Sequence, residues 1–126
     1  MSLRPTRIAF VAAMLSFGMP AVVAAASHNF TFRDAEFGPR DLRVQQARAY
    51  VTRTMAPGTS MESAIRAAKA AGARCAKPAG GSVLCTANFM QQHTGDGMFD
   101  IQWRVRIIAS LDGQSVTRSS VRRITN

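Results

Sequence analysis

The chain has 126 residues, with 16 Lys or Arg against seven Asp or Glu and a formal net charge of +9. Its length accommodates a single domain, and a hydrophobic content of 47% excludes a disordered chain. Two cysteines exclude a disulfide-dense scaffold, and they cannot form a closed zinc site without histidine.

The first 26 residues have the pattern of a secretory signal peptide. Arg4 and Arg7 form a basic start, residues 8–23 are almost entirely apolar, and residues 24–26 are three alanines. A basic start, an apolar middle and small residues at a peptidase site are typical of signal peptides. We therefore expect cleavage at the alanines and a periplasmic or secreted protein. The alternative is an uncleaved segment that tethers the protein to the membrane.

Residues 27–38 show no sustained hydrophobic period, so we expect an irregular N-terminal segment ahead of a single domain at 39–126. Within that domain, the first predicted helix runs from Pro39 to about Met55. Its apolar residues recur at roughly helical spacing and comprise Val44, Ala47, Val51 and Met55, with Tyr50 beside them.

The second predicted helix opens with a capping box formed by Thr59 and Glu62, and Gly72 ends it in the left-handed conformation. Glu62 and Arg66 are spaced for an i,i+4 ion pair on its exposed side. The apolar face of this helix comprises Met61, Ala64, Ile65 and Ala68.

Cys75 and Cys85 follow the second helix and lie in the exported part of the chain, where oxidation is possible. Their spacing matches no redox or metal-binding motif, so we predict a structural disulfide that ties the end of the helix to the first strand. Two buried free thiols are the alternative. Closing this loop would stabilise the fold by about 3 kcal/mol in the chain-entropy model.

Three strands are predicted in the C-terminal half, at residues 82–91, 99–109 and 115–124. Apolar and polar residues alternate in the first two, which is typical of strands with one buried face. Their inward residues are Val83, Cys85, Ala87 and Phe89, followed by Phe99, Ile101, Trp103, Val105, Ile107 and Ala109.

The last two strands are joined by Asp112-Gly113, a two-residue hairpin signal. In the last strand, Val116 and Val121 fall on opposite faces of a regular strand. Burying both valines requires a β-bulge, which we expect near residues 118–120. The order of two helices and an antiparallel meander predicts an α+β domain, with both helices packed on the apolar face of a three-stranded sheet.

Two motifs carry a resemblance to a known family. Residues 57–62 (PGTSME) open the second helix that Gly72 ends, and residues 111–116 (LDGQSV) form the last hairpin. On these motifs, residues 40–124 resemble the small periplasmic α-α-β-β-β modules typified by BamE (SmpA), which are related to repeats of a proteinaceous β-lactamase inhibitor. The resemblance implies a non-enzymatic envelope module that binds other proteins. Unlike BamE-type proteins, this chain has no cysteine for a lipid anchor at the expected mature start.

No arrangement of residues typical of catalysis is present. The histidines, His28 and His93, lie in no triad-like pattern and the carboxylates are scattered, so we predict that the protein is not an enzyme and needs no cofactor. His93, Asp96 and Asp100 are equally well explained as polar turn residues, and no metal site is predicted there. Cleavage after Ala25 would place His28 third in the mature chain, as in square-planar Cu(II) or Ni(II) sites, but we interpret this placement as incidental.

The arginines are the most informative polar residues. Arg104 and Arg106 share the outward face of the central strand. The last strand contributes Arg118, Arg122 and Arg123, whose faces depend on where the expected bulge lies. Guanidinium groups on an open sheet face can hold phosphate or carboxylate, so these arginines are our candidate anion- or partner-binding site. The alternative is a solvated face that only prevents aggregation. Nucleic acid is not expected, because one Trp and one Tyr offer little base stacking in an exported protein.

These observations favour an exported, non-catalytic envelope protein that acts as a protein–protein interaction or envelope-assembly module. One alternative is a binder of anionic glycolipid or cell-wall polymer through the arginines of the sheet. A second alternative is a secreted inhibitor of a hydrolase, with a loop at residues 78–81 or 93–98 entering the active site of the target. The sequence does not define the oligomeric state.

Overall fold

The computed structural model describes residues 30–93 and 97–126, with Gln92 and His93 described through their backbone alone. The predicted signal peptide, His28 and Asp96 lie outside the described residues. In the part of the chain that is described, no helix is long and apolar enough to span a membrane. The elements are, in chain order, α3 (Phe32–Glu36), the 3-10 helix η2 (Arg40–Leu42), α4 (Arg43–Thr54), α5 (Met61–Ala70), β1 (Arg74–Cys75), β2 (Ser82–His93), β3 (Gly97–Ala109) and β4 (Val116–Thr125).

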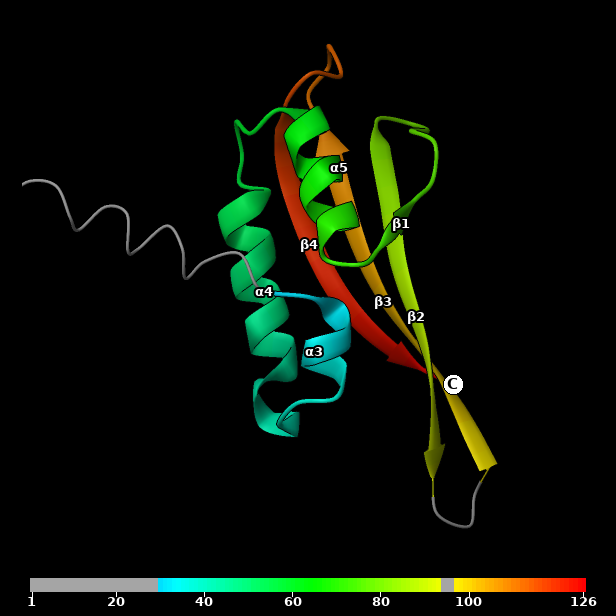
Figure 1. Cartoon of the computed structure of the whole chain (residues 1–126). Coiled ribbons are helices and arrows are strands. Elements are labelled where there is room, and N and C mark those ends of the chain that lie inside the picture. The colour runs from blue at the N-terminus through cyan, green and yellow to red at the C-terminus, as the bar shows by residue number, and fades with distance from the viewer. Residues whose placement is uncertain (1–29, 94–96) are drawn as a thin grey trace, which may run out of the picture.

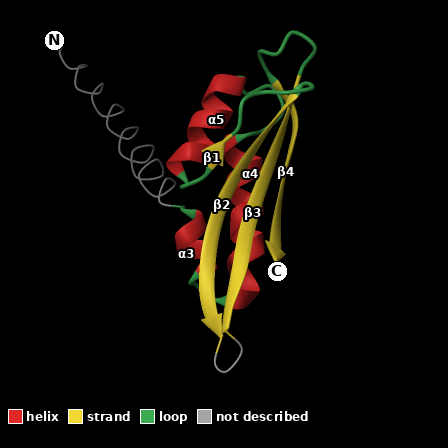
Figure 2. Cartoon of the chain, turned by 90° about the vertical axis from the view of Figure 1, so that its right-hand side faces the viewer, coloured by secondary structure: helices red, strands yellow, loops and turns green. Residues whose placement is uncertain are grey.

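The four strands form one antiparallel sheet in the order β1-β2-β3-β4. Two perpendicular views show that the helices cover one face of this sheet and leave the other open (Figures 1 and 2). The predicted α+β class is confirmed, but the predicted sheet of three strands is one strand short. The additional strand is β1, whose two residues are too few to show an alternating pattern.

The predicted disulfide joins Cys75 and Cys85, with an S–S distance of 2.08 Å. The two cysteines are directly opposite residues of β1 and β2, and Cys85 is fully buried. The disulfide therefore attaches the segment that follows α5 to the edge of the sheet.

The N-terminal segment at residues 27–38, expected to be irregular, contains a helix in its described part. The side chain of Thr31 caps α3 by accepting a hydrogen bond from a backbone N–H of its first turn. Phe32 is fully buried, and its N–H donates to the carbonyl of Ala71 at 3.0 Å. Glu36 at the end of α3 is also fully buried. This segment is thus part of the domain, and the expectation was wrong because a five-residue helix is too short to show a period.

The start of α5 differs from the predicted capping box of Thr59 and Glu62. The N-cap is Ser60, whose hydroxyl accepts a hydrogen bond of 3.0 Å from the N–H of Ser63. Thr59 acts through its backbone instead, since its carbonyl accepts a bond of 2.8 Å from the N–H of Val116. Thr59, the predicted cap, therefore attaches the start of α5 to β4 through its backbone.

Other local features of α5 are confirmed. Gly72 follows the helix with a φ of 100°, in the left-handed region. Glu62 and Arg66 form an exposed ion pair with an N–O distance of 3.4 Å. On the inner side of the helix the buried residues are Met61, Ala64 and Ala68, with Ile65 partly buried.

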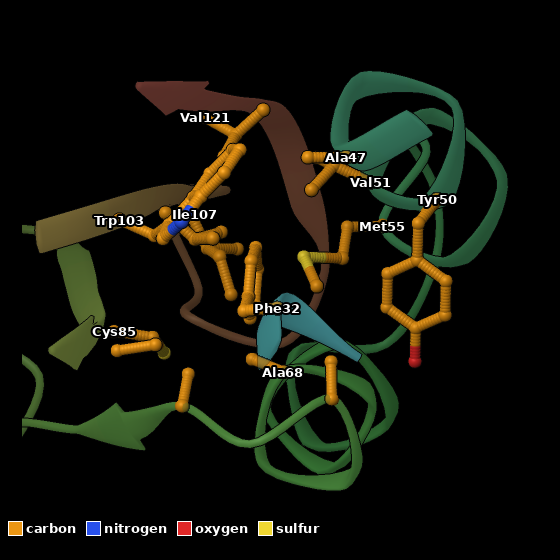
Figure 3. Packing of buried hydrophobic residues seen from close by; sticks show 14 of the residues in the cluster. Phe32, Ala47, Tyr50, Val51, Met55, Ala68, Cys85, Trp103, Ile107 and Val121 are labelled. Atoms are coloured by element: carbon orange, nitrogen blue, oxygen red, sulfur yellow. The ribbon is translucent and has the colours of Figure 1, made fainter. Parts of the chain in front are cut away.

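The core lies between the helices and the covered face of the sheet (Figure 3). Trp103 of β3 and Phe32 of α3 are its largest fully buried side chains, and their ring centroids lie 5.6 Å apart. Phe30 contacts Phe32 at 5.3 Å and stacks on Tyr50 of α4 at 4.7 Å. The Tyr50 hydroxyl donates to the carbonyl of Ala67 at 2.9 Å. One chain of contacts thus links α3, α4, α5 and β3.

The predicted β-bulge is present in β4. Thr117 is the extra residue, because its neighbours Val116 and Arg118 pair with consecutive residues of β3. The bulge changes the face on which the later residues lie, so that Val116 and Val121 are both buried. The extra residue comes one position before the expected range of 118–120 in the chain.

The loop between β3 and β4 is wider than the predicted two-residue hairpin. The N–H of Ser110 donates to the carbonyl of Ser115 at 2.8 Å, which leaves four residues in the loop. The Asp112 carboxylate accepts bonds of 2.6 Å from the Ser110 hydroxyl and 2.9 Å from the N–H of Gln114. These bonds lower the pKa of Asp112. The side chain of Asp112 therefore organises the wider loop.

Candidate functional site

A buried carboxylate lies between the helices and the sheet. The Glu36 side chain is 0% exposed and accepts two bonds of 2.8 Å from Arg123, through Nε and Nη2. Trp103 Nε1 donates to it at 2.9 Å and Gln91 Nε2 at 2.6 Å. Arg43 Nη1 is more distant, at 3.4 Å. We name these five residues the Glu36 cluster; they come from α3, α4, β2, β3 and β4.

The sheet register brings two members of this cluster together. Trp103 and Arg123 are directly opposite residues of β3 and β4, so their side chains share the covered face. The Arg123 guanidinium carbon lies 6.0 Å from the centre of the Trp103 ring, within range of a cation–π contact. Arg123 is therefore held from one side by an aromatic ring and from another by the carboxylate of Glu36.

The Glu36 cluster keeps its carboxylate ionised. Burial alone would raise the pKa of Glu36, but the hydrogen bonds from Arg123 and Trp103, with the charges of Arg123 and Arg43, lower it below its usual value. The hydrogen bond to Glu36 raises the pKa of Arg123 in turn. An ionised carboxylate whose oxygens already accept several bonds is poorly suited to proton transfer. The cluster is thus better suited to holding arginines in place than to acid–base chemistry.

Arg43 is the least satisfied member of the cluster. Its side chain is 13% exposed and, within the described ranges 30–93 and 97–126, its ion pair is the long contact of 3.4 Å to Glu36. Its Nε atom is buried and has no hydrogen-bond partner among the described residues. Unpaired buried donors are rare in native proteins, so this atom marks a place where the polar network is incomplete.

A cavity of about 450 Å³ opens beside the cluster, between the start of α4, the start of β3 and the end of β4. This volume lies in the range of small-molecule sites. Three arginines contribute to its wall, and the apolar lining comes from α4 and β3. The lining residues are Arg40, Arg43, Val44, Gln91, Phe99, Ile101, Arg123 and Thr125.

The uncovered face of the sheet carries the other predicted arginines. Arg104 and Arg122 are directly opposite each other, and Arg118 is opposite Ile108. Arg104, Arg106, Arg118 and Arg122 are all exposed. Between them lie three half-buried aliphatic side chains, and we name these seven residues together the open face. The aliphatic members are Leu84, Ile108 and Ile124.

Arg123 does not belong to the open face, contrary to its placement beside Arg104 in the candidate site. The bulge at Thr117 and the alternation that follows it turn Arg122 outward and Arg123 inward. Arg123 therefore joins the Glu36 cluster. The structure brings the four other predicted arginines together on one surface and places the fifth on the opposite side of the sheet.

Of the candidate metal-ligating side chains, Asp100 lies within the described residues. Asp100 is exposed near the start of β3, whereas Asp96, His28 and the side chain of His93 lie outside the described residues. Among the residues that are described, no group of three or more His, Cys, Asp or Glu side chains could hold a metal ion.

The residues that sequence reasoning missed are Glu36, Arg40, Arg43 and Gln91. The sole sequence signal for Glu36 was its spacing from Phe32 on one turn of a capped helix. No family model, curated protein or solved structure matches this chain. The fold and these surfaces define a small α+β domain with one basic cavity and one basic sheet face, and function has to be inferred from those two features.

Proposed function

We propose that this protein is an exported, non-catalytic binding module whose open face docks on an acidic surface of another envelope protein. The observation that carries this proposal is the cross-strand pair Arg104 and Arg122. Like charges directly opposite each other destabilise a sheet. Because the pair lowers the stability of the isolated domain, an anionic partner is its natural counterpart.

The surroundings of this pair offer no internal compensation. Within the described residues, no carboxylate forms an ion pair with the arginines of the open face. Asp100 lies on the same face, but it pairs with Met90 in the register and contacts none of the arginines through an ion pair. Arg104 donates instead to Gln102, which in turn donates to Asn88 at 2.9 Å. The positive charge of the open face is therefore available to a partner.

A protein partner is favoured over a lipid or polymer by the composition of the open face. Half-buried Leu84, Ile108 and Ile124 lie among the arginines, which gives a surface of mixed charged and aliphatic character. Arginine is enriched in protein–protein interfaces, where its planar fork binds carboxylates. The resemblance to BamE-type modules and the expected signal peptide support the same proposal, because both favour a partner in the envelope.

The test is in vivo crosslinking and purification of the tagged protein from its native envelope, with proteins and lipids identified together. The charge-reversal variant Arg104→Glu/Arg122→Glu is compared with Arg48→Glu/Lys69→Glu, which makes the same charge change on exposed helix positions. We expect one identified protein with an acidic surface, lost in the first variant and retained in the second. The mass of the recovered chain should match a start near residue 27.

Two results would overturn the proposal. The first is a folded Arg104→Glu/Arg122→Glu variant that captures the same protein as the wild type. The second is enrichment of anionic lipid or cell-wall polymer without a protein, lost at high salt, which would make the open face a lipid- or polymer-binding site. If the captured protein is a hydrolase, inhibition at a near-stoichiometric ratio would identify the module as an inhibitor.

A further inference from the structure

We propose that the cavity beside the Glu36 cluster binds a small organic monoanion, namely a carboxylate that carries an apolar body. This site lies on the covered side of the sheet and is separate from the open face. It goes beyond the proposed docking function, and it does not depend on it.

The first argument is the saturation of Glu36. A carboxylate offers about four lone-pair sites to donors. Arg123, Trp103 and Gln91 already donate four bonds between 2.6 and 2.9 Å. The additional contact from Arg43, at 3.4 Å, is longer than a normal hydrogen bond between charged groups. The guanidinium of Arg43 therefore has donors that Glu36 cannot satisfy.

The second argument is the charge balance of the cavity wall. Arg40, Arg43 and Arg123 line the cavity, and Glu36 is the carboxylate within the adjoining cluster. Among the described residues, no ion pair neutralises Arg40. Glu36 neutralises Arg123 through two bonds of 2.8 Å. Arg43 is only 13% exposed and its contact to Glu36 is longer, at 3.4 Å. A mostly buried charge without a close counter-ion is costly. An anion in the cavity would supply the missing negative charge.

The third argument is the apolar part of the cavity wall. Val44, Phe99 and Ile101 contribute the apolar lining. A ligand with its head on Arg40 and Arg43 would place its body against these side chains. The planar fork of an arginine matches a carboxylate through two parallel bonds. A ligand with an apolar body gains binding free energy from each methylene group that it buries. Inorganic phosphate has no such groups and cannot gain it.

The test is calorimetric titration of the purified full chain with octanoate. We expect saturable binding that weakens about fourfold for each methylene removed, measured with hexanoate and butyrate. Arg43→Gln should weaken octanoate binding at least tenfold, as expected for losing a charged hydrogen bond. Arg104→Gln on the open face is the matched control and should leave octanoate binding unchanged.

A second variant keeps the test decisive if Arg43→Gln fails to fold. Arg40 is exposed and lies outside the Glu36 cluster, so Arg40→Gln should fold and still weaken octanoate binding several-fold. Absence of saturable octanoate binding would overturn the proposal, as would wild-type affinity for octanoate in the folded Arg40→Gln and Arg43→Gln variants. Tighter binding of inorganic phosphate than of octanoate would also overturn it. If the open face proves not to dock on an envelope protein, the expected octanoate results stay the same, because the cavity is separate from that face.

Discussion

Glu36 and Arg123 lie 87 residues apart in the chain and are joined by two parallel hydrogen bonds of 2.8 Å. They connect α3, the first described helix, with β4, the last strand. The carboxylate is fully buried and the guanidinium is 20% exposed. Breaking such a pair leaves an uncompensated charge in the interior. We therefore expect the free energy of unfolding to depend strongly on this contact between α3 and β4.

Replacing Glu36 should therefore destabilise the fold strongly. Glu36→Gln removes the negative charge but keeps the shape, and it leaves Arg123 and Arg43 without their counter-ion. We expect a loss of about 3–5 kcal/mol in the free energy of unfolding, measured by urea denaturation. Glu62→Gln is the matched control, because its pair with Arg66 is exposed and should contribute less than about 1 kcal/mol. Equal losses in the two variants would show that the buried pair has no special role.

Stability should also depend on pH through Glu36. Its folded-state pKa is lowered, because the bonds from Arg123 and Trp103 and the nearby positive charges outweigh the cost of burial. The stabilising contribution is thus complete above the unfolded-state pKa of about 4.3 and is lost as the pH falls from there through the folded pKa.

Denaturation measured between about pH 6 and pH 2 should give a shallower acid limb for Glu36→Gln than for the wild type. Asp112 also has a lowered pKa, since Ser110 and the N–H of Gln114 donate to it. Both proteins retain Asp112, so the difference between the two curves isolates Glu36. Parallel acid limbs would contradict the assignment of a lowered pKa to this group.

The sequence predicts best those elements whose burial repeats along the chain. α4, α5, β2 and β3 each place several apolar residues on one face, and their periods are visible without tertiary information. The bulge in β4 was predictable for the same reason, since Val116 and Val121 cannot both be buried in a regular strand. The hydrophobic pattern requires a bulge between these valines, but it does not specify that Thr117 is the extra residue.

The Glu36 cluster could not be predicted, because its four donor residues and the acceptor Glu36 come from five separate elements that no local pattern relates. Arg123 shows the difficulty most clearly. Its face depends on the position of the bulge, and one residue decides whether it points to solvent or to Glu36. Arg104 and Arg106 of the open face were predictable from the clear alternation of β3, whereas the faces of Arg118 and Arg122 also depend on the position of the bulge.

The start of α5 offers a test of the observed cap against the predicted one. Ser60→Ala removes the hydroxyl that accepts from the N–H of Ser63 at 3.0 Å, and we expect a loss of about 1 kcal/mol. Thr59→Ala keeps the backbone carbonyl that accepts from Val116, so it should change stability by less than about 0.5 kcal/mol. Thermal denaturation of the two variants gives the comparison. The reverse order of losses would favour the capping box of Thr59 and Glu62.

Removing the disulfide should loosen one edge of the sheet before it affects the rest. β1 has two residues, so its attachment relies on Cys75–Cys85 and a few backbone bonds, including that from the N–H of Ala76 to the carbonyl of Leu84 at 2.9 Å. Cys75→Ala/Cys85→Ala should lower the free energy of unfolding by about 3 kcal/mol.

Amide hydrogen exchange distinguishes local loosening from global loss in this variant. The Ala76 amide should exchange much faster than in the wild type, by more than the global loss explains, because β1 can open while the core stays folded. The Trp103 amide in β3 should become less protected only in step with global stability. Equal acceleration at Ala76 and Trp103 would mean that β1 and the core unfold as one unit. The disulfide would then stabilise the whole domain rather than its edge.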